Sequence, residues 1–133
     1  MPGTRKIPKE LAELGRRFQI GVYEQHLATT PDDADVLESL GHLLTRSGRL
    51  EEGLAADRRL VELRPGEPLA HYNLACSLAL IGDARAALER LRRAMEMGFR
   101  DVEFIRKDTD FASLRHDPRF EALLREFAAT GKK

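Results

Sequence analysis

The sequence is poor in cysteine, in aromatic residues and in net charge. It contains one cysteine, Cys76, and no tryptophan, and aromatic residues make up 6% of its 133 residues. A single cysteine excludes an intramolecular disulfide framework and a zinc cluster held by cysteines. Lys and Arg number 22, as do Asp and Glu, so the formal net charge is zero. Such a balance disfavours binding to nucleic acid or to an anionic membrane surface through bulk charge.

Long apolar runs are also missing. No stretch approaches the roughly 20 apolar residues that a helix needs to span a bilayer. The basic residues near Met1 are not followed by the apolar segment that a secretory signal contains. We therefore expect a cytoplasmic protein without a membrane partner, and we expect the first few residues and the pair Lys132 and Lys133 to be frayed.

Helix-forming residues dominate what is present. The chain is rich in Ala, Leu, Glu and Arg, and its length predicts one domain with a core of its own. Apolar residues recur at helical spacing, and no segment alternates as a half-buried strand does. This pattern predicts an all-α fold with helices near 8–29, 33–47, 50–63, 68–81 and 83–97, and shorter ones near 101–107 and 118–129. Gly15 is the position at which we expect the first helix to break.

An internal repeat runs through the middle of the chain. A shift of 34 residues pairs Leu40 with Leu74, and the same shift pairs Gly48 with Gly82. It also aligns Pro31 with Pro65, Leu44 with Leu78, Leu54 with Leu88, Arg58 with Arg92, Arg59 with Arg93 and Glu62 with Glu96. No insertion is needed between residues 31 and 98. Each unit reads as two helices, with Gly48 suited to a left-handed C-terminal cap, Pro68 to a first helical turn and Asp83 to an N-cap.

These residues resemble the tetratricopeptide repeat family, whose pattern is Trp-x2-Leu-Gly-x2-Tyr, then Ala-x3-Phe, then Pro, over 34 residues. The first full unit fills those positions with Leu37, Leu40, Gly41, Leu44, Gly53, Asp57 and Pro65. The second fills them with His71, Leu74, Ala75, Leu78, Ala87, Leu91 and Phe99. Two departures stand out, because Asp57 occupies a position for a large apolar side chain and Phe99 replaces the terminating proline. Tyr23 and Pro31 fit the second half of an earlier, degenerate unit.

The resemblance implies a right-handed α-solenoid of helical hairpins. It predicts a degenerate half-repeat or cap at 8–33, a first repeat at 34–67, a second at 68–100 and a C-terminal helical cap at 101–129. The segment 114–124 is similar to the one that closes many bacterial members, which predicts a small stand-alone bacterial protein. Apolar side chains are available for the C-terminal cap: Phe104, Ile105, Phe111, Leu114, Phe120, Leu123, Leu124 and Phe127.

Stacked hairpins curve, and the first helix of each pair lines the concave side. Helical spacing predicts a partner-binding groove lined by Asp35, Glu38, His42, Thr45, Arg46, Leu69, Tyr72, Asn73, Cys76 and Ala79. Such a surface fits an extended or helical peptide, with Tyr72 as an anchor. This predicts a non-enzymatic interaction module that needs no cofactor. Acidic chaperone tails, which some members bind, are excluded as partners because Glu38 would repel their carboxylates.

Three alternatives compete with this interpretation. The chain's own terminal helix fills the groove; the chain self-associates as a homo-oligomer without an external ligand; or His42 and Cys76 form a catalytic or metal site. The last lacks an orienting third group, and a buried cysteine usually serves as a small apolar residue.

Other polar residues favour structural roles. His71 is predicted to be a hydrogen-bonded core histidine, and Asp108, Asp110 and Asp117 are predicted to be helix caps rather than a cation site. Five arginines lie on the second helices of the repeats: Arg58, Arg59, Arg90, Arg92 and Arg93. We interpret them as a solvated face with ion pairs such as Glu89 with Arg93 and Glu62 with Arg58.

Overall fold

The computed structural model describes residues 8–131, and the predicted fraying of the two ends lies outside that range. The elements follow one another as α1 (Lys9–Thr29), α2 (Ala34–Arg46), α3 (Leu50–Leu63), α4 (Pro68–Ile81), α5 (Ala84–Glu96), α6 (Val102–Lys107), the 3-10 helix η1 (Thr109–Leu114) and α7 (Pro118–Gly131). The predicted all-α class is confirmed. None of the helices within residues 8–131 combines the length and the apolar character needed to cross a membrane.

The 34-residue period appears directly in the helix boundaries. Helix α4 begins 34 residues after α2, and α5 begins 34 residues after α3. Gly48 and Gly82 both follow the first helix of a pair with positive φ values of 79° and 98°. Glycine adopts this left-handed conformation without the steric penalty of a Cβ atom. Asp83 caps α5 as predicted, because its side chain accepts a hydrogen bond from the Ala86 amide.

Two local predictions need correction. Helix α1 runs without a break through Gly15, since one glycine weakens an α-helix without ending it. Residues 109–114, for which no helix was predicted, form η1. The Asp108 side chain starts η1 by accepting a hydrogen bond from the Asp110 amide.

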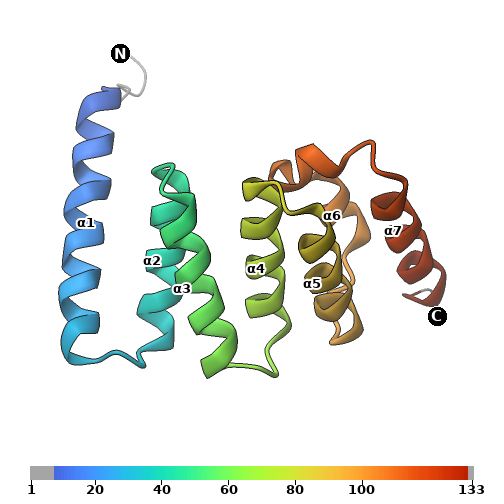
Figure 1. The fold of residues 1–133 in the computed structure, drawn as a ribbon, viewed down its shortest axis with the longest axis horizontal. Helices are drawn as coiled ribbons and strands as arrows, with labels where there is room; N and C mark the ends of the chain where they lie inside the picture. Colours follow the sequence, from blue (N-terminus) through green and yellow to red (C-terminus); the bar gives the residue numbers. More distant parts are fainter. Residues whose placement is uncertain (1–7, 132–133) are drawn as a thin grey trace, which may run out of the picture.

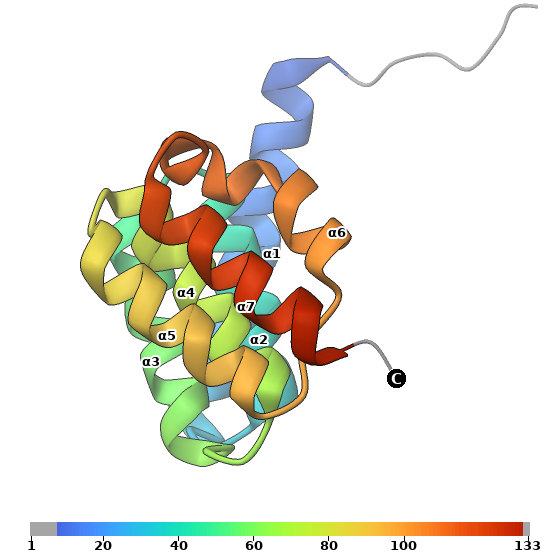
Figure 2. The ribbon, with the colours of Figure 1, turned by 90° about the vertical axis from the view of Figure 1, so that its right-hand side faces the viewer.

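The helices stand side by side in a row from α1 to α7 (Figure 1). Seen along this row, α3 and α5 lie on one side and α6 on the other, with α7 crossing the end (Figure 2). The most extensive contacts join α2 to α3 and α4 to α5. The two helices of the first pair approach closely at Gly53, where an added Cβ atom would lie 2.5 Å from Thr45 Oγ1 and 3.4 Å from the Gly41 carbonyl oxygen. The packing is that of successive helical hairpins.

Apolar side chains form two clusters of unequal size. The smaller joins α1, α2 and α3 around Ile20, Leu40 and Leu44. The larger joins α4 and α5 to α6, η1 and α7. Seven of the eight side chains proposed for the C-terminal cap are buried in it, whereas Phe104 is 53% exposed. The segment 101–129 therefore packs as an integral part of the molecule.

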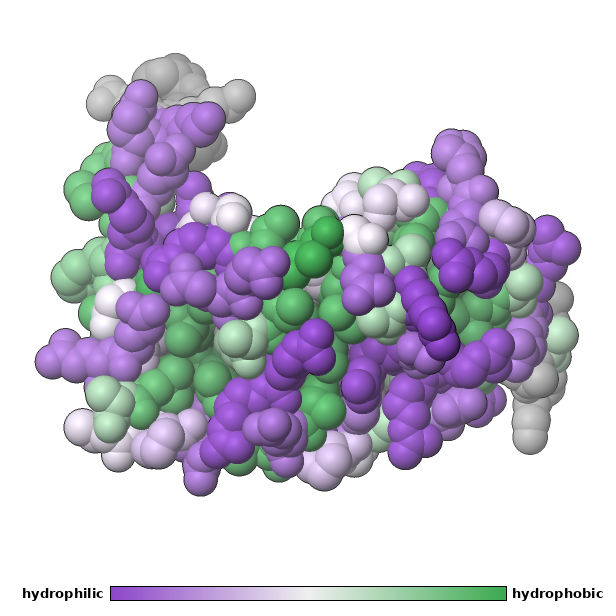
Figure 3. Space-filling model, in the orientation of Figure 1, coloured by the Kyte–Doolittle hydropathy of each residue, from purple (hydrophilic) through white to green (hydrophobic). Residues whose placement is uncertain are grey.

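One face of α1 remains uncovered. Leu11, Leu14, Phe18 and Val22 recur three or four residues apart and are all exposed. The space-filling view shows this apolar edge in green on the outer side of α1 (Figure 3). We refer to these four residues as the α1 stripe.

Candidate binding groove

A hollow of about 570 Å³ lies between α2, α4 and the α6–η1 segment. Gly41, His42, Thr45, Arg46 and Asp57 line it from the first repeat, and Leu69, Tyr72, Asn73, Cys76, Ser77 and Leu80 line it from α4. Phe99, Phe104, Asp108, Thr109 and Asp110 complete it from the C-terminal side. The hollow therefore combines apolar, aromatic, acidic and basic groups within one concavity. We refer to it as the groove.

The structure brings seven of the ten predicted groove residues together. His42, Thr45, Arg46, Leu69, Tyr72, Asn73 and Cys76 line the groove. Asp35 instead pairs at 2.9 Å with Arg64, the residue that follows α3, and Glu38 does not line the hollow. Ala79 is buried under η1, where its carbonyl accepts a hydrogen bond from Ser113 Oγ at 3.3 Å. Partner binding by these residues stays a prediction.

Tyr72 is not an exposed anchor. Its side chain is 4% exposed, and its ring stacks on Phe99 with the ring centroids 4.2 Å apart. Its hydroxyl donates a hydrogen bond to Asp108 Oδ2, and burial together with this bond raises the pKa of Tyr72. The exposed apolar groups of the groove are Leu69, at 41%, and Phe104, at 53%. A ligand would meet these two side chains first.

The sequence-based prediction missed the C-terminal wall of the groove. Phe99, Phe104 and the acidic residues of the α6–η1 segment lie outside the repeat, so the 34-residue period cannot place them. One signal was available: Phe99 stands where the family pattern has proline, which indicated that the chain leaves the second repeat differently. The C-terminal segment thus occupies part of the concave side without filling it.

A buried carboxylate lies at the base of the groove. Asp57 of α3 is 6% exposed, and its Oδ2 accepts a hydrogen bond from Ser77 Oγ of α4. Burial raises the pKa of Asp57 to about 6, the Ser77 hydrogen bond acts in the opposite direction, and the charge of Glu38 raises it further. A Cβ atom on Gly41 would lie 2.9 Å from Asp57 Oδ1. The departure from the family pattern at Asp57 is therefore accommodated by a glycine and a serine.

Cys76 lacks the features of a reactive thiol. Burial raises its pKa, and the nearby Asp108 carboxylate adds to this effect. A thiolate is the nucleophilic form of cysteine, and this environment keeps the thiol protonated at neutral pH. Although His42 and Cys76 both line the groove, the proposed catalytic pair lacks an activated nucleophile.

The thiol of Cys76 and the carboxylates of Asp108 and Asp110 lie within 4.8 Å of one another. They are close enough to contact one cation, but Asp108 already accepts hydrogen bonds from Tyr72 and from the Asp110 amide. Burial and the charge of Asp108 raise the pKa of Asp110. Asp117 is engaged elsewhere, where it accepts a hydrogen bond from the Arg119 amide at 2.9 Å. The capping predictions for Asp108 and Asp117 are confirmed, whereas the one for Asp110 is wrong, because Asp110 lies inside η1 and Asp108 is its N-cap.

His71 is a hydrogen-bonded core residue, as predicted. Its Nδ1 lies 3.0 Å from Arg90 Nη1, and its Nε2 lies 2.7 Å from the Pro65 carbonyl oxygen. Because a guanidinium only donates, Nδ1 must accept and Nε2–H must donate to the carbonyl, which defines a neutral imidazole.

The arginines of the second helices form ion pairs, although not the two that were predicted. Arg59 pairs with Glu62 and Asp32, Arg92 with Glu126 of α7, and Arg93 with Glu96. The Arg93–Glu96 and Arg59–Glu62 pairs are spaced i to i+3, where the prediction used spacings of four. Four of the five arginines thus have a partner, counting Arg90 with His71.

Comparison with known proteins supports the tetratricopeptide resemblance. The chain is 33% identical over 114 residues to the peroxisomal targeting signal receptor of Eremothecium gossypii, and 33% identical over 116 residues to that of Saccharomyces cerevisiae. It is 30% identical over 129 residues to the protein CTR9 homolog of Arabidopsis thaliana. These relatives contain tetratricopeptide repeats, so the similarity supports assignment to that family. No protein-family model matches the chain.

The three matches cover most of this chain but little of each relative. They include 86%, 85% and 94% of the chain, which corresponds to 20%, 19% and 12% of the respective relatives. The similarity therefore concerns the helical repeat region, and it suggests a module for protein–protein interaction.

Proposed function

We propose that this chain is a tetratricopeptide repeat adaptor that binds an extended or helical peptide of a partner protein in the groove. The observation that carries this proposal is the groove itself, in which exposed Leu69 and Phe104 flank a concavity that also presents charged side chains. Apolar anchors surrounded by polar groups are typical of peptide-binding grooves. The relatives named as targeting-signal receptors support a binding role.

The expected ligand has an apolar side chain that contacts Leu69 and Phe104. It also carries both positively and negatively charged groups. His42 and Arg46 are exposed on the α2 side, while Asp108 and Asp110 face the hollow from the other side. Opposite charges on the two walls orient a peptide rather than merely attract it. No step of this function requires a metal or a cofactor.

A peptide display selection followed by an affinity measurement tests the groove. We expect peptides selected on the wild-type chain to bind Leu69→Ser and Phe104→Ser at least about tenfold more weakly, because each variant removes an apolar anchor. Both side chains are substantially exposed, so the fold should be preserved. Leu14→Ser is the matched control, since Leu14 is also 53% exposed but lies on α1. Equal losses in all three variants would contradict the proposal.

Self-association is a second candidate function, favoured by the α1 stripe. Four exposed apolar residues on one helix face form a surface that monomeric proteins usually cover. A second copy supplies a matching stripe through a two-fold contact.

A further inference from the structure

A second hollow, of about 310 Å³, lies between the first half of α1 and the C-terminal end of α2. Its lining is rich in cationic side chains: Lys9, Arg16, Arg17, Arg46 and Arg49. The only carboxylate in the lining drawn from residues 8–131 belongs to Glu13. Because the whole chain has no net charge, this concentration of positive charge is a local feature. The N-terminal part of α1 is correspondingly hydrophilic on the side that faces the rest of the molecule (Figure 3). We refer to this hollow as the basic pocket.

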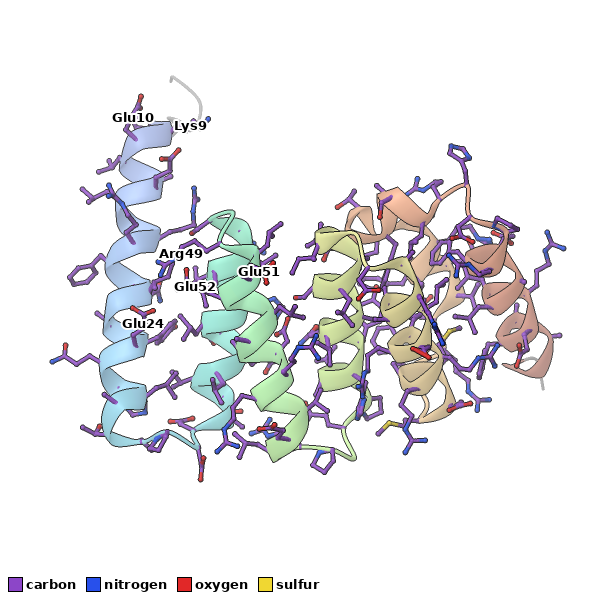
Figure 4. All side chains as sticks on the ribbon, in the orientation of Figure 1. Lys9, Glu10, Glu24, Arg49, Glu51 and Glu52 are labelled. Atoms are coloured by element: carbon purple, nitrogen blue, oxygen red, sulfur yellow. The ribbon has the colours of Figure 1, made fainter. Side chains whose placement is uncertain are left out.

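Among residues 8–131, one of the five cations, Arg49, is neutralised by carboxylates. Arg49 donates two hydrogen bonds of 2.6 Å to Glu52, and Glu24 lies 3.8 Å from its Nη2. The three side chains gather between α1 and α3 (Figure 4).

The other four cations, Lys9, Arg16, Arg17 and Arg46, form no ion pair with any residue of the described range. The charge of Arg46 lowers the pKa of Asp110, but these two side chains form no ion pair. The pocket therefore carries a net excess of positive charge that the acidic groups within residues 8–131 leave uncompensated.

Two polar atoms of the pocket are buried without a hydrogen-bond partner among residues 8–131. They are Arg16 Nε and Ser47 Oγ, and both residues line the pocket. The Arg16 Nε–H donates only and the Ser47 hydroxyl can also donate, so each of them can bind an acceptor that carries negative charge. Buried donors without acceptors are rare because their desolvation is unfavourable.

We propose that the basic pocket binds a phosphate group. Arginine guanidinium groups bind phosphate through paired, charge-assisted hydrogen bonds, and three arginines and a lysine are available here. The phosphate is carried either by a small molecule or by a phosphorylated residue of a protein partner. Arg46 lines both the basic pocket and the groove, so a phosphorylated peptide reaches both at once. The phosphate site itself does not depend on peptide binding in the groove.

Thermal unfolding in the presence of inorganic phosphate tests this proposal, at an ionic strength held constant with sodium chloride. We expect a saturable rise in Tm for the wild-type chain, because a ligand that binds only the folded state stabilises it. Arg16→Gln and Arg17→Gln should each raise the half-saturating phosphate concentration about tenfold, because each removes a guanidinium that binds phosphate. The matched controls are Arg58→Gln and Arg93→Gln, which lie at a hollow on the α3 and α5 side.

A second arm of the experiment distinguishes the two sources of the phosphate group. Titration with a phosphoserine-containing peptide is compared with titration of free O-phosphoserine: tighter binding of the peptide points to a phosphorylated partner, and equal binding of the two points to a small-molecule phosphate. Circular dichroism without phosphate verifies that the variants are folded, and Arg17 is exposed, so its variant should retain the fold. The proposal is overturned if chloride alone raises the Tm equally, or if the Arg16 and Arg17 variants respond as the wild type does.

Discussion

At the scale of single residues, Asp57 shows how one exception to a repeat pattern is tolerated. In the second repeat the equivalent position holds Leu91, which is fully buried. In the first repeat the carboxylate of Asp57 needs a donor and space, which Ser77 and Gly41 provide. The sequence predicted that packing is unusual here, because the position is normally apolar. It could not predict the solution, since Ser77 comes from the following repeat and only the folded chain brings the two together.

Asp57 makes stability depend on pH in a direction opposite to that of most paired carboxylates. Its pKa of about 6 in the folded chain exceeds the ordinary value of 3.8, so the folded state holds its proton more tightly than the unfolded state does. The free energy of unfolding should therefore fall as pH rises from about 4 to about 6, by at most about 3 kcal/mol.

Urea denaturation of the wild type and Asp57→Asn over this range measures the effect. Asparagine keeps an acceptor for Ser77 but does not titrate, so the difference in unfolding free energy between the two proteins should change with pH. Ser77→Ala should move the transition to higher pH, because the hydrogen bond from Ser77 lowers the pKa of Asp57. A difference that is constant from pH 4 to pH 7 would show that Asp57 does not titrate in this range.

At the scale of elements, the repeated helices were predictable and the docking of the C-terminal segment was not. Apolar spacing and the 34-residue shift define α2 to α5 because each signal is present twice. By contrast, η1 is short, and its contacts are long-range: Tyr72 bonds to Asp108, the N-cap of η1, across 36 residues. Such a contact leaves no periodic trace in the sequence. This is also why the groove residues of α2 and α4 were largely identified whereas its C-terminal wall was missed.

Substitutions at Phe111 and Phe104 test how much the α6–η1 segment contributes to the free energy of unfolding. Phe111 of η1 is fully buried, with its ring 5.7 Å from that of Tyr72 and 5.7 Å from that of Phe120, whereas Phe104 of α6 is 53% exposed. We expect Phe111→Ala to lower the free energy of unfolding by about 3–5 kcal/mol, as for other buried aromatic residues. Phe104→Ala should lower it by less than about 1 kcal/mol.

The rate at which Cys76 reacts with a thiol reagent gives an independent readout. Because η1 packs on α4, loosening it should expose Cys76, so Phe111→Ala should react faster than the wild type and than Phe104→Ala. If Phe111→Ala and Phe104→Ala have equal stability and equal thiol reactivity, η1 does not hold α4 as described.

At the scale of the whole molecule, the row of helices ends differently on its two sides. At the C-terminal end, apolar side chains of α6, η1 and α7 join the larger cluster. The N-terminal end presents α1, whose inner face packs through Ile20 and whose outer face carries the α1 stripe. Hairpin stacks need their terminal apolar faces covered. The sequence analysis predicted the 34-residue period and a cap at each end. It did not predict that α1 would keep an exposed apolar face while α7 buries its own, because both α1 and α7 are amphipathic.

The α1 stripe predicts concentration-dependent self-association. Gly15 and Gly21 lie in the same helix with no atom within 4 Å of an added Cβ position, so a second helix can approach α1 closely. Light scattering after size exclusion should give a mass above 15.0 kDa that rises with protein concentration.

Phe18→Glu should restore the monomer without loss of stability, since Phe18 is 74% exposed and a charge there disfavours an apolar contact. Phe104→Glu, which alters an exposed phenylalanine at the other end of the row, should leave the mass unchanged. A wild-type mass that stays at 15.0 kDa at every concentration would mean that the stripe does not pair with itself, and the exposed face of α1 would then need a partner other than a second copy of this chain.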